Sequence, residues 1–400
     1  MDFSDTTQEA QYRAKARDFL DAHVGHHPSL AGDEPERLAK QRRWQAIKAE
    51  NGFACITWPK EWGGAGGTAM ERVIFREEEA RRGVPDAFFG IGLGLCVPTI
   101  IKYASDEQKS AMVRPAVRGE QIWCQLFSEP AAGSDLAGIR AKAVRNGDDW
   151  VVSGQKVWTS GAHYSDYGLI IARTDPDQPK HKGMTMFFVR MDAPGVEIRP
   201  IHQMSGGVEF NEVFFNDVRI PDAQRLGEVD GGWGVAIYAL MNERVQGGKE
   251  RGIPAAETID LAHNTPVGGG TLADDGAFRA AFADWYVRTR GVQLTRYRTL
   301  TAISRGQTPG PEAAIGKLVS AAEMQEMSRL LVEAQGPYGL VDDAGLSMLG
   351  GNVHHDLMHA PGIRIAGGTD EILRNIIAER VLGLPKGPQP DKNRPFSETK

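Results

Sequence analysis

The sequence contains only three cysteines, Cys55, Cys96 and Cys124, and they are far apart in the chain. Their spacing matches no metal-binding or redox motif, so neither kind of cysteine site is predicted. We therefore expect a protein of a reducing cytoplasm.

No excess of basic residues is present either: 46 lysines and arginines stand against 52 acidic residues, giving a net charge of −6. This balance argues against a general nucleic-acid-binding role. The longest apolar stretch, residues 88–101, is too short and too rich in glycine to cross a bilayer. The polar, amphipathic start of the chain is not typical of a signal peptide. Neither nucleic acid nor membrane insertion is expected.

Four hundred residues predict two or three packed units, and the periodicity of the apolar residues changes twice along the chain. Helical spacing gives way to short strands of period two and then returns, which predicts an α+β fold. The strands favour a β-barrel or a sandwich. The expected units are an N-terminal helical domain (1–121), a middle β domain (122–226), a C-terminal helical domain (227–385) and a disordered tail (386–400). The four helices are expected at about 232–262, 276–305, 311–335 and 369–382.

Two helix starts carry local signals. Ser105 is a predicted N-cap that forms a capping box with Gln108. Thr369 is the second predicted N-cap, with acidic residues in the first turn that follows. The residues just before Thr369 include a strand-like segment from 363 and two consecutive glycines, Gly367 and Gly368.

Two loops stand out as possible ligand sites. Residues 127–139, "FSEPAAGSDLAGI", are small or turn-forming and offer hydroxyl groups, although an ordinary inter-strand turn has the same composition. In residues 154–168, Trp158 begins a Trp-Thr-Ser run at a strand end. Small side chains let a planar ligand approach the backbone, and hydroxyls bond the edge of a heteroaromatic ring.

These loops, together with "WPKEWGG", "GPEAAIGKL" and "GGTDEILRNIIAERVLGLP", resemble motifs of the acyl-CoA dehydrogenase family in order and spacing. The resemblance extends from the N-terminal helices to about residue 385. It implies the acyl-CoA dehydrogenase fold, with a middle β-barrel domain and a C-terminal four-helix bundle. It also implies bound FAD, an acyl-CoA substrate, an electron-transfer flavoprotein as acceptor, and a homotetramer or a heterotetramer with a related chain.

The resemblance also implies roles for individual residues. Ser128 and Ser160 match hydroxyls near the flavin ring, Trp158 matches a tryptophan against the isoalloxazine, and Ser134 matches a contact with both cofactor and substrate. Thr369 and Glu371 match the helix start near the pyrophosphate, where a carboxylate in place of the usual glutamine would repel the ligand. The full set of implied cofactor contacts is Phe127, Ser128, Gly133, Ser134, Trp158, Thr159, Ser160, Gln335, Gly339, Thr369 and Glu371.

Many members of the family carry the catalytic base at the position of Gly367, where only the backbone N–H remains to bind the thioester oxygen. Some relatives instead place the base at the position matching Glu243. Helical spacing puts Trp233, Ile237, Leu240, Met241 and Val245 on one apolar stripe, with Arg244 near its middle and Glu243 at its margin. We therefore predict Glu243 as the base, supported by Arg244. Ser134, Arg244 and Gly368 are the predicted substrate contacts.

Residues 259–270 lack the arginine that grips the FAD pyrophosphate in many relatives. A structural partner subunit of a heteromeric acyl-CoA dehydrogenase is therefore one alternative function, and a flavin monooxygenase or oxidase of the same fold is another. The small residues 366–368 favour a long, branched or ring-bearing acyl chain. No metal site is predicted, because His355 and His359 lack further ligands at matching spacing.

Overall fold

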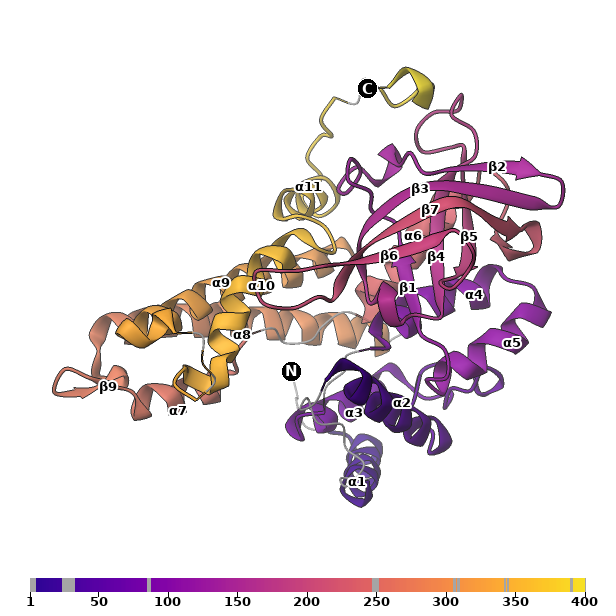
Figure 1. Ribbon diagram of the computed structural model, residues 1–400. Helices are drawn as coiled ribbons and strands as arrows, with labels where there is room; N and C mark the ends of the chain where they lie inside the picture. The colour runs from indigo at the N-terminus through magenta and orange to yellow at the C-terminus, as the bar shows by residue number, and fades with distance from the viewer. Residues whose placement is uncertain are drawn as a thin grey trace. The chain divides into compact units, whose positions relative to one another are not determined.

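The computed structural model describes residues 5–23, 33–84, 88–246, 252–304, 307, 310–341, 343, 345–388 and 391–399. The chain forms two compact units (Figure 1). The sheet unit comprises residues 1–201, 209–246 and 389–400, and the helical unit comprises residues 202–208 and 247–388. Among the described residues, no helix has the length and apolar character needed to cross a membrane.

The sheet unit begins with helices, as the sequence predicts. They are α1 (Thr7–Ala22), α2 (Glu34–Glu50), α3 (Ala69–Arg81), α4 (Val97–Tyr103) and α5 (Asp106–Val117). The capping box predicted at the start of α5 is confirmed. The Ser105 side chain accepts from the backbone N–H of Gln108 at 3.3 Å, and the Gln108 side chain accepts from the N–H of Ser105 at 3.1 Å.

Eight strands form one sheet with the order β6-β7-β3-β2-β4-β5-β8, and β1 pairs with β4. Most neighbours are antiparallel, while β1 and β2 are both parallel to β4. This sheet occupies the region predicted as the middle β domain. The strands are β1 (Trp123–Leu126), β2 (Lys142–Asn146), β3 (Asp149–Ser160), β4 (Tyr167–Arg173), β5 (Met184–Arg190), β6 (Val196–Ile201), β7 (Phe210–Pro221) and β8 (Arg225–Leu226).

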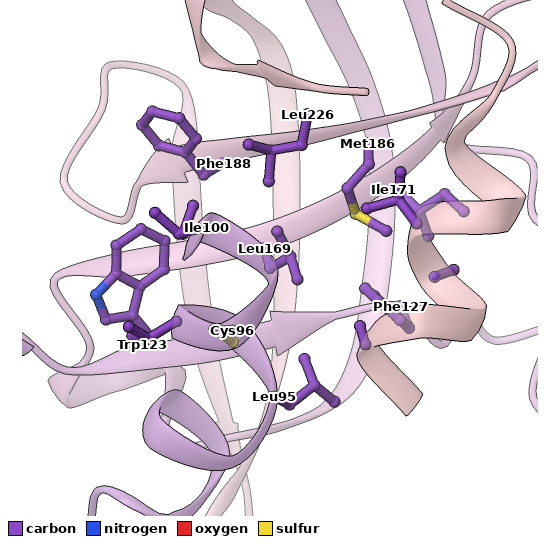
Figure 2. Packing of buried hydrophobic residues seen from close by; sticks show 14 of the residues in the cluster. Leu95, Cys96, Ile100, Trp123, Phe127, Leu169, Ile171, Met186, Phe188 and Leu226 are labelled. Atoms are coloured by element: carbon purple, nitrogen blue, oxygen red, sulfur yellow. The ribbon is translucent and has the colours of Figure 1, made fainter. Parts of the chain in front are cut away.

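Both faces of the central strands are buried. Successive side chains of a strand point to opposite faces of the sheet, and here each face packs into its own apolar cluster. On β4, Leu169 and Ile171 pack in the cluster shown in Figure 2, with α4 and with helix α6 (Gly232–Gln246). Ile170 and Ala172 join the cluster on the opposite face. Burial on both faces explains why residues 169–172 of this strand are all apolar in the sequence.

The helical unit contains α7 (Ala255–Asn264), α8 (Gly276–Ser304), α9 (Ala314–Ala334), α10 (Asn352–Ile365) and α11 (Asp370–Arg380). A short hairpin, β9 (Pro266–Val267) and β10 (Gly270–Thr271), follows α7. Trp285 of α8, Leu331 of α9 and Val353 of α10 are buried together in the core of this unit.

Three expectations from the sequence differ from the structure. The single helix expected at 232–262 is two helices, α6 and α7. The segment with a strand-like start at 363 is the end of α10, a helix that the sequence reading missed because Pro361 and Gly362 lie inside it. Packing of α10 against α9 compensates for these weak helix formers. Finally, residues 391–399 of the tail expected to be disordered contact the β4–β5 connection.

Candidate active site

The structure brings together the two loops that the sequence singles out, because residues 127–129 run beside β3. The backbone N–H of Val157 donates to the carbonyl of Ser128 at 2.9 Å. The Lys156 ammonium donates to the carbonyl of Phe127 at 3.2 Å. The hydroxyl-bearing start of one loop is therefore fixed next to Trp158 at the end of the other.

A buried ion pair strengthens this junction, and the sequence reading missed it. Lys156 Nζ lies 2.7 Å from Glu129 Oε1. The Glu129 carboxylate also accepts from the backbone N–H of Arg140 at 2.6 Å and of Ala141 at 3.0 Å. Burial lowers the pKa of Lys156, and the Glu129 charge opposes that shift. A lysine among buried strand positions was the available signal, since an unpaired charge is rarely found there.

Trp158 has an unusual backbone and an exposed ring. Its φ is +59°, a left-handed conformation that is a genuine outlier for a bulky residue. It lies where the pairing of β3 with β7 shifts register, and its side chain is 59% exposed. Phe210 meets the indole edge-on, with 6.1 Å between ring centroids. A large aromatic face presented in this way suits a planar ligand.

The neighbours of Trp158 separate into exposed and buried groups. Ser128 and Ser160 are partly exposed, and Gly133 and Ser134 are exposed. Thr159 and the Phe127 ring are buried, and no hydrogen-bond partner of the Thr159 hydroxyl is found among the described residues. The cofactor contacts that the resemblance implies for Phe127 and Thr159 stay predictions. A Cβ at Gly133 would meet nothing within 4 Å, so the surface beside it is open.

Helix α6 packs against the sheet through small residues. A Cβ at Gly232 would lie 2.8 Å from the backbone of β5, so only glycine permits this approach. Val235, Ala236 and Ala239 are buried on the same face. The large residues Ile237 and Met241 of the predicted stripe are exposed instead.

Trp233 and Leu240 of the predicted stripe are partly buried and pack against the same apolar cluster, so only part of the stripe is exposed in this chain. Positions 243 and 244 belong to the last turn of α6, and their side chains lie outside the described residues. By helical spacing, position 243 follows Ala239 by four residues and falls on the face that packs against the sheet.

In the helical unit, Gly367 and Gly368 form the turn between α10 and α11. Their φ angles are +65° and +104°, and the second lies beyond the left-handed region that other residues tolerate. Thr369 then begins α11 as predicted, accepting from the backbone N–H of Ile372 at 3.3 Å. Two glycines are needed because both residues before the N-cap have positive φ angles. The backbone amide and the Thr369 hydroxyl lower the pKa of the exposed Glu371, so it stays ionised.

Two further residues, both missed by the sequence reading, hold this turn. Lys317 of α9 donates to the carbonyls of Arg364 at 2.9 Å and Gly368 at 2.6 Å. Arg364 in turn binds the buried Asp370 at 2.5 Å. Lys317 lies in the "GPEAAIGKL" motif, so the motif itself was a signal.

Gln335 and Gly339 have roles within the helical unit. The Gln335 side chain is buried and accepts from the backbone N–H of Met348 at 2.9 Å. A Cβ at Gly339 would collide with the carbonyl of Val332. This internal bond holds the Gln335 side chain, and the cofactor contact that the resemblance implies for Gln335 stays a prediction.

Comparison with known proteins identifies the family of this chain. Sequence models of the N-terminal, middle and C-terminal domains of acyl-CoA dehydrogenases match residues 6–120, 124–218 and 230–382. The acyl-CoA dehydrogenase IpdE1 of Mycolicibacterium smegmatis is 36% identical over 396 residues, covering 94% of this chain and 98% of that protein. FadE34 of Mycobacterium tuberculosis is also 36% identical, over 91% of this chain, which spans only 49% of its length.

Solved structures give the same result. The ChsE4-ChsE5 complex from Mycobacterium tuberculosis contains a chain that is 30% identical, with a TM-score of 0.79, covering 97% of this chain and 100% of that one. A chain of the Tcur3481-Tcur3483 steroid acyl-CoA dehydrogenase is 27% identical, with a TM-score of 0.80 and the same coverage. The predicted fold is thereby confirmed. The chain belongs to the acyl-CoA dehydrogenase family of flavin-dependent oxidoreductases.

Proposed function

We propose that this protein is an FAD-dependent acyl-CoA dehydrogenase that uses Glu243 as its base. The observation that carries the proposal is the junction of the 127–134 loop with β3, which places Ser128 beside the segment bearing the exposed Trp158 ring. An open surface at Gly133 and partly exposed hydroxyls at Ser128 and Ser160 fit the edge and face of a flavin.

The assignment of Glu243 rests on two features. The position matching the usual base is Gly367, held at φ +65° in a tight turn. Position 243 continues the face of α6 that includes Ala236 and Ala239, which share an apolar cluster with Phe127 of the site loop. The proposed base would gain basicity on desolvation, which destabilises the charged form of a carboxylate. Arg244 remains a predicted supporting residue.

The reaction removes two hydrogens from adjacent carbons. The Glu243 carboxylate takes the α-proton of the thioester, while a β-hydride leaves the substrate, giving a trans-2-enoyl-CoA. When bound, FAD supplies the hydride acceptor at N5. The backbone N–H of Gly367 would stabilise the charge that develops on the thioester oxygen. An electron-transfer flavoprotein is the proposed acceptor of the electrons.

We propose a ring-bearing acyl group as substrate. One structural neighbour is a steroid acyl-CoA dehydrogenase, and residues 366–368 place no side chain larger than a methyl group at the turn before α11. Thioesters with long or branched chains are the competing choice.

A heteromeric assembly is the second proposal. Two of the structural neighbours are named as pairs of proteins, ChsE4-ChsE5 and Tcur3481-Tcur3483. In this chain, the hairpin after α7 offers no arginine between residues 259 and 270. A partner subunit would then supply the positive charge for the FAD pyrophosphate.

The decisive experiment is an anaerobic titration of the purified flavoprotein with ring-bearing, long, branched and short acyl-CoA thioesters. Bleaching of the flavin absorbance by one class would establish dehydrogenation and identify the substrate class. Flavin that no thioester reduces would favour the oxygen-using alternative. A chain that purifies without flavin would call for co-expression with a partner subunit.

The role of Glu243 is tested by Glu243→Gln, which should lower the rate of flavin reduction on the order of 10³-fold while leaving FAD bound. Glu228→Gln is the matched control, because Glu228 is exposed and precedes α6. Flavin reduction by Glu243→Gln at the wild-type rate would show that another group is the base.

A further inference from the structure

The last described residues of the chain attach to the connection between β4 and β5. The backbone N–H of Phe396 donates to the carbonyl of Gln178 at 2.8 Å, and that of Ser397 donates to the carbonyl of Pro176 at 2.8 Å. The Ser397 hydroxyl donates to Asp177 at 3.2 Å. Residues 391–399 therefore join the sheet unit, although α11 before them belongs to the helical unit (Figure 1, yellow).

Arg173, at the end of β4, lies between this tail and the site loop. The Phe396 ring covers its guanidinium, with 4.0 Å between the guanidinium carbon and the ring centroid. The same guanidinium donates to the carbonyls of Lys182 at 2.7 Å and Ala137 at 2.7 Å. One buried side chain thus links the tail, the β4–β5 connection and the 127–139 loop.

A second link runs through the β4–β5 connection itself. Lys180 forms an ion pair with Asp135 at 2.9 Å, and Asp135 follows Ser134 directly. His181 packs edge-on against Trp233 of α6, with 4.9 Å between ring centroids. Burial lowers the pKa of His181, Lys180 lowers it further, Asp135 opposes this, and Lys392 of the tail adds to the lowering. The connection therefore contacts both the site loop and α6.

We propose that residues 391–399 act as a clasp that holds the β4–β5 connection, and through Arg173 and Lys180 the 134–138 segment, in the shape needed to bind flavin and acyl-CoA. Phe396 is then a positioning residue. The part of this inference that concerns ligand affinity rests on the proposed function, whereas the ordering of the loop by the tail does not.

The physical reason is that the buried Arg173 guanidinium donates to backbone carbonyls, and no ion pair of Arg173 with a carboxylate is found among the described residues. Burial lowers the pKa of Arg173 to about 10, with Glu129 opposing the shift most strongly. Contact with the Phe396 ring compensates part of the desolvation of the guanidinium. Loss of the ring would leave the Arg173 guanidinium less restrained. The backbone at Ala137 and Lys182, whose carbonyls bind this guanidinium, would then be less restrained as well.

The test compares four variants of the full-length protein with the wild type. Two should lose the clasp: deletion of residues 389–400, and Phe396→Ala. Phe396→Tyr keeps an aromatic face and should behave as wild type. Phe214→Ala is the matched control, because it removes a similar arginine–ring contact, at 4.5 Å from Arg199, between β6 and β7.

Hydrogen exchange of the amides of residues 134–139 is the first readout, since the N–H of Gly138 is bonded to the carbonyl of Asp135 at 2.8 Å. Exchange there should accelerate at least about tenfold in the two clasp variants and stay unchanged in both controls. The second readout is the Kd of FAD together with KM and kcat for the thioester that reduces the wild-type flavin. Kd and KM should rise about tenfold, while kcat should stay within about twofold. A displaced loop would weaken the binding of the substrate and of the transition state equally, which changes KM but not kcat.

Unchanged exchange in the deletion variant would overturn the clasp. Faster exchange with unchanged Kd and KM would overturn its link to ligand binding. A wild-type flavin that no thioester reduces would instead contradict the proposed function and leave the exchange result as an independent measurement.

Discussion

The Lys156 ammonium lies 2.7 Å from Glu129 Oε1, and both side chains are almost fully buried. This pair connects β3 to the loop that carries Ser128 and Ser134. Because breaking a buried ion pair from one side leaves an uncompensated charge, Lys156→Met should lower the free energy of unfolding by about 3 to 5 kcal/mol. Urea titration followed by circular dichroism measures this loss.

Glu129→Gln should lower the free energy of unfolding less than Lys156→Met does, and the size of this loss should depend on pH. Burial lowers the folded-state pKa of Lys156, and Glu129→Gln removes the charge that opposes that shift. Lys156 then deprotonates in the folded variant at a lower pH than in the unfolded chain. The loss in the free energy of unfolding should therefore shrink as pH rises. Glu333→Gln removes an exposed pair with Arg329 and should cost less than about 1 kcal/mol. A pH-independent deficit in Glu129→Gln would contradict a charged Lys156.

Replacement of Trp158 should separate backbone strain from ligand contact. Its ring is exposed, so Trp158→Ala should hardly change the stability of the flavin-free protein. The φ of +59° favours glycine, so Trp158→Gly should be about 1 kcal/mol more stable than Trp158→Ala. Thermal unfolding of the flavin-free variants measures the difference.

The same two variants should both bind FAD about tenfold more weakly, which corresponds to about 1.4 kcal/mol. Trp158→Phe should retain most of the affinity because it keeps an aromatic face. Equal flavin affinity in Trp158→Ala and wild type, measured by fluorescence quenching, would show that the indole does not contact the ring.

The turn before α11 should tolerate no side chain at Gly368. Its φ of +104° lies outside the left-handed region, so Gly368→Ala should lower the free energy of unfolding by about 1 to 3 kcal/mol. Gly291, exposed within α8 and with open space at its Cβ position, is the matched control. Gly291→Ala should stabilise the helix by about 0.5 to 1 kcal/mol. Destabilisation of both variants alike would point to a general effect of added methyl groups.

Glu323 of α9 should make stability depend on pH. It is buried, and Arg288 contacts its Oε1 at 2.7 Å while also binding Asp284 and Glu326. No hydrogen-bond partner of its Oε2 is found among the described residues. Burial, only partly offset by Arg288, raises the pKa of Glu323 from 4.5 to about 7.

The folded protein therefore keeps this proton up to about pH 7, whereas the unfolded chain loses it near 4.5. The contribution of Glu323 is fully present below pH 4.5 and is lost as pH rises to about 7. Glu323→Gln should remove this pH-dependent loss. Its free energy of unfolding should exceed that of wild type by about 1 to 3 kcal/mol between pH 5 and pH 8. Glu333→Gln, which alters an exposed carboxylate of α9 that pairs with Arg329 instead, should follow the wild-type pH profile.

Local signals in the sequence determined the order of helices and strands and the caps at Ser105 and Thr369. Capping, periodicity and turn residues act over a few positions, so a single sequence can reveal them. Motifs in register also identified the family and the two segments around Ser128 and Trp158 that the structure brings together.

Contacts between distant residues were decided only by the tertiary structure. The buried face of α6 depends on how closely β5 can approach Gly232, and the helix through Pro361 depends on packing against α9. The Lys156–Glu129 pair and the attachment of Phe396 to Arg173 join residues 27 and 223 positions apart. No local pattern encodes such contacts, because their stability comes from burial and charge pairing that exist only once the chain has folded.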